Sequence, residues 1–143
     1  MVGEVAPEVK ALVEHTEKSF WKGLEFAKVG MRTGDIGNAV QEYCEGLGYG
    51  VVRELTGHGI GTTMHQDPDV PNYGRPGHGY KLKKGMAICI EPMITLGSRE
   101  IELLGDGWTI VTQDGKPASH YENTILITDE GPYLTTYDYE EGY

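Results

Sequence analysis

A single carboxylate interrupts one of the most apolar stretches of this 143-residue sequence. Glu91 lies within MAICIEPMI (86–94). Burying an unpaired carboxylate costs roughly several kcal/mol, so a chain that retains one must provide a partner for it. The partner could be a metal ion, an arginine such as Arg53 or Arg99, or water in a cleft. The segment alone leaves these three alternatives open.

A second candidate group is His58, within the glycine-rich sequence GHGIG (57–61). Glycines on both sides of a histidine allow the backbone and a metal ion to approach closely. A lone histidine in such a segment is more often an ordinary turn residue. His58 therefore becomes a candidate ligand only together with other groups.

The third candidate is Glu122, in SHYENTILI (119–127). The alternation of a strand places His120, Glu122 and Thr124 on one face. An exposed sheet face would explain Glu122 equally well. Taken together with Glu91 and His58, however, one imidazole and two carboxylates suit Mn, Fe, Co or Zn. A divalent cation would also remove the repulsion between two facing carboxylates.

Three further residues could serve such a site. His65 follows His58 by seven positions and could be a ligand, a proton donor or an ordinary loop histidine. Met64 and Trp108 could line an apolar pocket or simply belong to the core. The sequence has no G-x-S-x-G, P-loop or HExxH motif, which argues against the corresponding hydrolase and nucleotide-binding classes.

The composition restricts the partners. Twelve basic against 22 acidic residues give a net charge of −10, which disfavours nucleic acid. A hydrophobic fraction of 38% without a long apolar run predicts no membrane span. The first residues do not resemble a secretion signal, and two cysteines do not make a disulfide framework. We therefore expect a cytoplasmic protein.

The elements that must position these groups begin with two helices. The first is predicted to start at Pro7 and to stop at Gly30. The second is predicted to start at Thr33 as its N-cap and to end at Gly48. Its predicted buried residues are Ile36, Val40, Tyr43 and Leu47.

From Val51 onward the pattern favours strands and turns. The predicted strands cover 51–55, 86–95, 99–104, 108–112, 118–128 and 132–135. A long loop without clear periodicity is predicted over 57–84, and loops of that length are usually functional or disordered. We expect one domain over 1–136 and an acidic flexible tail over 137–143.

Five segments in this order carry a resemblance: GHGIG (57–61), MHQDP (64–68), GM (85–86) leading to IEPM (90–93), DGWT (106–109) and HYENT (120–124). From about residue 2 to 135 the sequence resembles the type I methionine aminopeptidases, which have the pita-bread fold. The resemblance implies an α+β fold. Specifically, it implies half of a pita-bread domain, with two helices packed on a curved, mainly antiparallel sheet.

The resemblance also implies roles for the candidate residues. His58, Glu91 and Glu122 would be metal ligands, and Glu91 would also handle protons as a catalytic residue. His65 would contact the scissile peptide and steady the tetrahedral intermediate. Met64 and Trp108 would stand in the pocket for the N-terminal methionine side chain of a peptide substrate.

The sequence departs from the family pattern in two places. Family members carry two aspartate ligands and a histidine before the segment that resembles residues 2–4, and these 143 residues contain no counterpart. Asn123 stands where a histidine usually follows the second glutamate. Asp67, Asp69 and Asp106 are predicted to lie in loops and do not replace the missing pair.

Two functions therefore remain open, and with them the question of whether the chain alone is an enzyme. The first is metal-dependent hydrolytic removal of an N-terminal methionine, weak or absent unless a dimer or a partner completes the site. The second is a non-catalytic truncated or engineered half-domain that binds at most one metal. In either case the exposed face of a half-fold favours a homodimer.

Overall fold

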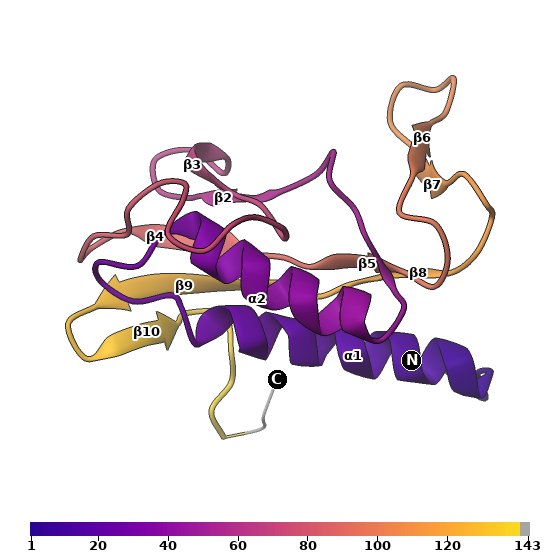
Figure 1. Ribbon diagram of the computed structural model, residues 1–143, viewed down its shortest axis with the longest axis horizontal. Coiled ribbons are helices and arrows are strands. Elements are labelled where there is room, and N and C mark those ends of the chain that lie inside the picture. Colours follow the sequence, from indigo (N-terminus) through magenta and orange to yellow (C-terminus); the bar gives the residue numbers. More distant parts are fainter. Residues whose placement is uncertain (141–143) are drawn as a thin grey trace.

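Two helices, α1 (Pro7–Leu24) and α2 (Thr33–Gly46), form one layer of the protein (Figure 1). The computed structural model describes residues 1–140. Helix α1 begins at Pro7 as predicted but ends at Leu24, not near Gly30. The chain turns after Leu24 with Ala27 still buried, which explains why the apolar spacing continued past the helix end.

Helix α2 begins close to the predicted residue, but its N-cap is Arg32. The Asp35 carboxylate accepts a hydrogen bond of 2.7 Å from the Arg32 backbone N–H. The Thr33 hydroxyl instead accepts a hydrogen bond from the Tyr80 N–H. The prediction that Leu47 is buried is wrong. Helix α2 ends at Gly46, and Leu47, which follows it directly, is 48% exposed.

The described residues form three antiparallel sheets. The strands are β1 (Gly50–Val51), β2 (Gly57–Gly59), β3 (Gln66–Val70), β4 (Ala87–Ile90), β5 (Met93–Thr95), β6 (Ile101–Leu103), β7 (Ile110–Thr112), β8 (Ala118–His120), β9 (Asn123–Thr128) and β10 (Gly131–Leu134). The largest sheet has the order β10-β9-β4-β2-β3, the second β1-β5-β8, and β6-β7 is a separate hairpin. This arrangement confirms the predicted α+β half of a pita-bread fold.

Two predicted strands are each divided in two. The segment 86–95 becomes β4 and β5, interrupted at Glu91 and Pro92. The segment 118–128 becomes β8 and β9, interrupted at Tyr121 and Glu122. Pro92 has no N–H to donate to a ladder, which gives a physical reason for the first break. Because β4 pairs with β9 and β5 with β8, both breaks lie side by side.

The prediction of one continuous loop over 57–84 is wrong in two places, since β2 and β3 lie within it. Strand β2 carries no apolar alternation because its neighbours leave no room for side chains. A Cβ on Gly57 would lie 2.3 Å from the Cys89 carbonyl oxygen, and one on Gly59 would lie 2.2 Å from that of Asp67. Asp67 and Asp69 consequently lie on β3 and not in a loop.

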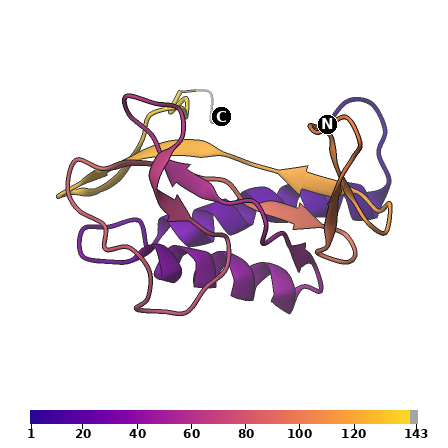
Figure 2. The ribbon, with the colours of Figure 1, turned by 90° about the horizontal axis from the view of Figure 1, so that it is seen from above.

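The main core lies between the helices and the largest sheet, and Figure 2 shows both helices along the same side of the strands. Phe20 and Ile36 of the helices pack there with Ile88, Ile90 and Ile125 of β4 and β9. A second cluster joins α1 and α2 to β1 and β5. Its members are Leu12, Val40, Cys44, Val51 and Ile94. Cys44 and Cys89 are buried free thiols, as expected from the sequence.

The segment after β10 returns to the helices. Tyr137 packs edge-on against Trp21 with ring centroids 5.3 Å apart, and the Tyr139 hydroxyl accepts a hydrogen bond from the Leu134 N–H. The rest of the predicted tail, 141–143, lies outside the described residues, and a domain boundary after 136 stays a prediction. Within residues 1–140, neither helix has the length and apolar character needed to cross a membrane.

Candidate metal centre

The two candidate carboxylates lie at the paired strand breaks. Ile90 pairs with Asn123 and Met93 pairs with His120, so the same register places Glu91 opposite Glu122. The Glu91 side chain is 13% exposed and that of Glu122 is 39% exposed. Like charges directly opposite one another across a strand pair are destabilising. This position therefore favours a cation between them.

Glu91 contacts two histidines, one on each side. Its Oε1 lies 3.3 Å from His58 Nε2, and its Oε2 lies 3.3 Å from His120 Nε2. His58 comes from β2 and His120 from the end of β8, so three separate segments meet at one carboxylate. Glu122 lies 3.9 Å from the same His120 nitrogen. Glu91 is thus the centre of the cluster.

The alternative that an arginine neutralises Glu91 is wrong. Arg53 forms its ion pair with Glu45, at 3.4 Å. Arg99 pairs with the adjacent Glu100, at 3.3 Å. Among the described residues, the ion-pair partners recorded for Glu91 are the two histidines.

The backbone fixes the orientation of His58. Its Nδ1 lies 2.9 Å from the Gly59 carbonyl oxygen, which can only accept, so Nδ1 carries the proton of that bond. In the neutral ring, Nε2 then presents a lone pair toward the Glu91 carboxylate. A lone pair and a carboxylate 3.3 Å apart need a proton or a metal ion between them. The donor set therefore fits a divalent metal of the kind that imidazole and carboxylate prefer.

Sequence reasoning missed His120 as a site residue. The Glu91 carboxylate raises the pKa of His120 above its ordinary value, although partial burial opposes this shift. The available signal was the strand alternation that places His120 on the same face as Glu122. That face was identified, but no role was assigned to the histidine.

Asn72 was also missed. Its side-chain amide donates a hydrogen bond of 2.9 Å to the backbone carbonyl of Glu91, and the residue is only 1% exposed. This bond holds the chain at the break between β4 and β5. No sequence signal could have found it, because Asn72 lies in the segment without periodicity.

Cys89 lies behind the cluster. Ligand atoms of His58, Cys89 and Glu122 lie within 4.8 Å of one another, as do those of Glu91, His120 and Glu122. Burial raises the pKa of the Cys89 thiol to about 11.

His65 lies at the entrance of the site. Its ring centroid is 4.3 Å from that of His58, and its side chain is exposed. The structure thus brings His65 next to the ligand cluster, as a residue that contacts substrate requires.

Met64 and Trp108, by contrast, are not enclosed in a pocket by the described residues. They are 71% and 87% exposed. Trp108 lies in the turn of the β6-β7 hairpin, which projects away from the helices (Figure 1). A hydrogen bond from the Thr109 hydroxyl, together with those from the Thr109 and Trp108 N–H groups, lowers the pKa of Asp106 to about 2.

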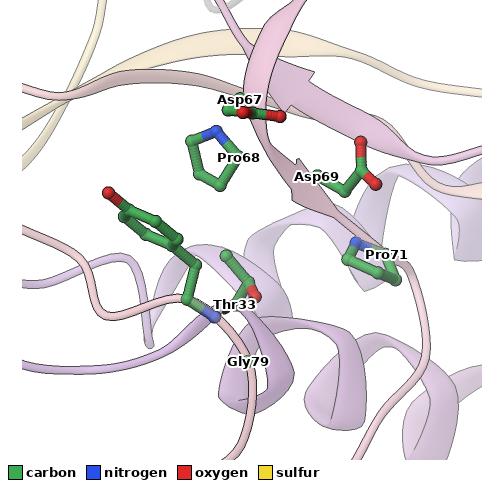
Figure 3. Close-up of a pocket in the computed structure, with 7 residues that line it drawn as sticks. Thr33, Asp67, Pro68, Asp69, Pro71 and Gly79 are labelled. Carbon is green, nitrogen blue, oxygen red and sulfur yellow. Dashed lines mark hydrogen bonds between the residues drawn. The ribbon is translucent and has the colours of Figure 1, made fainter.

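Two cavities differ in their relation to this cluster. An apolar cavity of about 250 Å³ reaches His120 and is lined by side chains of β5, β6, β7 and β8. A larger one of about 440 Å³ lies between β3 and the start of α2, with Asp67 and Asp69 on one side and Thr33 on the other (Figure 3). None of the predicted site residues is among the described residues that line it. Cavity size therefore does not identify the site here.

Carboxylates that meet imidazoles at paired strand breaks are a donor set suited to a divalent metal. Residues 1–129 match the metallopeptidase family M24, and the chain belongs to that family. Membership implies a divalent metal. The chain is 52% identical over 135 residues to the methionine aminopeptidase of Clostridium acetobutylicum, covering 94% of this chain and 54% of the relative.

Other relatives give the same result. Methionine aminopeptidase 1 of Bacillus subtilis is 48% identical over 130 residues, which cover 91% of this chain and 52% of the relative. The crystal structure of methionine aminopeptidase from Thermotoga maritima superposes with a TM-score of 0.93 at 43% identity, covering 96% of this chain and 55% of that one. The chain spans about half the length of the curated relatives it matches.

Proposed function

We propose that this chain forms the metal-binding half of a methionine aminopeptidase active site. The reaction is hydrolysis of the peptide bond after an N-terminal methionine. The observation that carries the proposal is that Glu91 lies opposite Glu122 across two paired strand breaks and 3.3 Å from His58 of β2. The chain that holds this cluster is 52% identical to a methionine aminopeptidase over 135 residues. The open face of this cluster leaves room for water and substrate beside the ligands.

His58, Glu91 and Glu122 are the proposed ligands, and Mn, Fe, Co or Zn the proposed metal. Such an ion supplies an acidified water and polarises the scissile carbonyl. Glu91 also takes part as a proton acceptor, because both its oxygens face nitrogen atoms and the side chain is only 13% exposed.

His65 is the proposed contact to the scissile peptide. Its ring lies against His58 and remains accessible from solvent, so it can donate a hydrogen bond to the peptide carbonyl oxygen. A donor fixed at this position stabilises the negative charge that develops on that oxygen in the tetrahedral intermediate.

Met64 and Trp108 are the proposed binding residues for the methionine side chain. Their 71% and 87% exposure supports a pocket that a second surface must close. We propose that another copy of the chain, or a partner that supplies the remainder of the relatives' length, provides that surface. A homodimer across a twofold axis is the simplest version. The acidic charge and the free thiols support a cytoplasmic protein that does not bind nucleic acid.

The same exposure supports a second candidate function. A chain that holds a metal but leaves its methionine pocket open could be a non-catalytic half-domain that binds at most one metal. In this case the chain has the same fold and ligand cluster but does not hydrolyse methionyl peptides.

Hydrolysis of a methionyl tripeptide separates the two. Activity should be measured with each of the four metals over a wide range of chain concentration, with light scattering in parallel. Glu122→Gln removes a proposed ligand, and the exposed Glu130→Gln is the matched control. Turnover that rises with dimer content and disappears only in Glu122→Gln supports the peptidase. A metal-loaded monomer or dimer without turnover supports the half-domain.

A further inference from the structure

His120 is as close to the two carboxylates as His58 is to Glu91. Its Nε2 lies 3.3 Å from Glu91 Oε2 and 3.9 Å from Glu122 Oε2. These three side chains form one of the two groups whose ligand atoms all lie within 4.8 Å of one another. The ligand set implied by the family resemblance does not include this histidine.

The separations differ from those of an ordinary ion pair. Charge-assisted N–H···O bonds are about 2.7–2.9 Å long. Two ligand atoms that each lie about 2.1 Å from one tetrahedral ion are separated by about 3.4 Å. The distances of 3.3 Å from Glu91 Oε1 to His58 and from Glu91 Oε2 to His120 are close to this second value.

We propose that His120 is a metal ligand, so that the Glu91 carboxylate has one ligating imidazole beside each of its oxygens and Glu122 opposite it. The proposal rests on the metal-binding function proposed above and extends it. His58 and Glu91 form the buried side of the site, at 12% and 13% exposure. His120 and Glu122 form the accessible side, at 48% and 39%.

The donor set determines which metals the site prefers. A second imidazole in place of an oxygen ligand favours Zn²⁺ and Co²⁺ over Mn²⁺, because carboxylate and water suit Mn²⁺ better than imidazole does. The single chain therefore binds Zn²⁺ and Co²⁺ more tightly than its three family-type ligands alone would allow.

Cys89 is the competing fourth ligand, because its sulfur shares a group with His58 and Glu122. The geometry favours His120. Cys89 is 1% exposed and its Sγ contacts the Thr124 hydroxyl at 3.4 Å, so it faces away from solvent at the back of the cluster. The His120 side chain is 48% exposed, so an ion can reach it from solvent.

Calorimetric titration of the 143-residue chain with Zn²⁺, Co²⁺ and Mn²⁺ tests the proposal. His120→Gln should weaken Zn²⁺ and Co²⁺ binding about 10–100-fold or more, since even removing a group that only supports a ligand has an effect of that size. Mn²⁺ binding should weaken less. The control is His78→Gln, which changes an exposed histidine whose Nδ1 lies 3.0 Å from the Pro76 carbonyl oxygen. This variant should bind metal like wild type. Circular dichroism verifies that each variant is folded.

A second measurement does not depend on a variant. Proton spectra of the Co²⁺-loaded chain should contain two strongly shifted imidazole N–H signals, one from His58 and one from His120. One such signal, with unchanged affinity in His120→Gln and loss of binding in Glu91→Gln, would overturn the role of His120 and leave the metal site intact. A near-ultraviolet sulfur-to-cobalt band lost in Cys89→Ser would assign the fourth position to Cys89 instead. No binding by folded wild type would refute both proposals.

Discussion

The residues proposed to bind metal and those proposed to bind substrate differ in how much the described structure buries and supports them. On the metal side, His58 and Glu91 are 12% and 13% exposed and are fixed by paired strands and backbone hydrogen bonds. On the substrate side, Met64 and Trp108 are 71% and 87% exposed on a loop and a projecting hairpin.

This difference shows that folding of the described residues fixes the proposed ligands but does not enclose Met64 and Trp108. His58 lies on β2, and Glu91 and Glu122 lie at the paired breaks between strands that pack on the hydrophobic core. Their positions are therefore set by folding. Met64 and Trp108, the residues proposed to bind methionine, are largely exposed and lack such support from the described residues. Metal binding and substrate binding should therefore respond separately to mutation.

The largest difference between the effect on metal binding and the effect on stability without metal is expected for Glu91→Gln. At free metal 100-fold above Kd, binding stabilises the wild type by about 2.7 kcal/mol, and this gain should be lost in the variant. Without metal, the stability should change by less than about 1 kcal/mol, because removing one of two facing charges relieves repulsion. Thermal unfolding with and without Zn²⁺ measures both. An unchanged metal-dependent shift in Glu91→Gln, with Glu130→Gln as the control, would remove Glu91 from the site.

The buried Cys44 thiol of helix α2 allows a prediction about the helix layer that does not involve the ligand cluster. Burial raises the pKa of the Cys44 thiol from 9.0 to about 11. Because the unfolded thiol ionises first, this stabilisation is complete below pH 9 and is lost as the pH rises toward 11. The loss is on the order of 2 kcal/mol.

Urea unfolding at pH 8 and pH 10.5 measures this effect. Wild type should lose more stability over that interval than Cys44→Ala does. Equal losses in the two proteins would show that the thiol ionises alike in the folded and unfolded states.

A smaller effect is expected for Asn72→Ala. The variant loses one buried hydrogen bond to the Glu91 backbone, worth about 1 kcal/mol, and loosens the break that positions the carboxylate. Metal affinity should fall with it. Asn38→Ala is the control, since its amide makes a longer bond of 3.4 Å to Gly74 away from the site. The role of Asn72 fails if both variants retain wild-type affinity for Zn²⁺.

The smallest effect on stability is expected for Trp108→Ala. A side chain that is 87% exposed should change the free energy of unfolding by less than about 0.5 kcal/mol and leave metal binding unchanged. If the assembled protein hydrolyses methionyl peptides, Trp108→Ala should lower kcat/KM by raising KM. A large destabilisation of the isolated chain would show that Trp108 belongs to its core.

Much of the fold and part of the candidate site could be predicted from the sequence. The helix starts and the α+β class followed from periodicity and end signals. Glu91 and Glu122 stood out because each was a carboxylate in a strand pattern. What periodicity could not provide was the register, which places the two glutamates opposite each other.

Other features depended on contacts between distant segments. The sequence pattern does not predict strand β2, because neighbouring backbones require glycine at positions 57 and 59 and these glycines leave no apolar alternation. Asn72 acts across 19 positions through one hydrogen bond. His120 became a candidate only when the break at Glu122 brought it to Glu91.

The metal content per chain shows whether these residues bind a metal ion around Glu91. It is measured by mass spectrometry after Zn²⁺ loading and exhaustive dialysis. One ion per chain is expected in wild type and in Glu130→Gln, and none in Glu91→Gln. A folded wild type without metal, or a Glu91→Gln variant that retains its ion, would contradict this expectation.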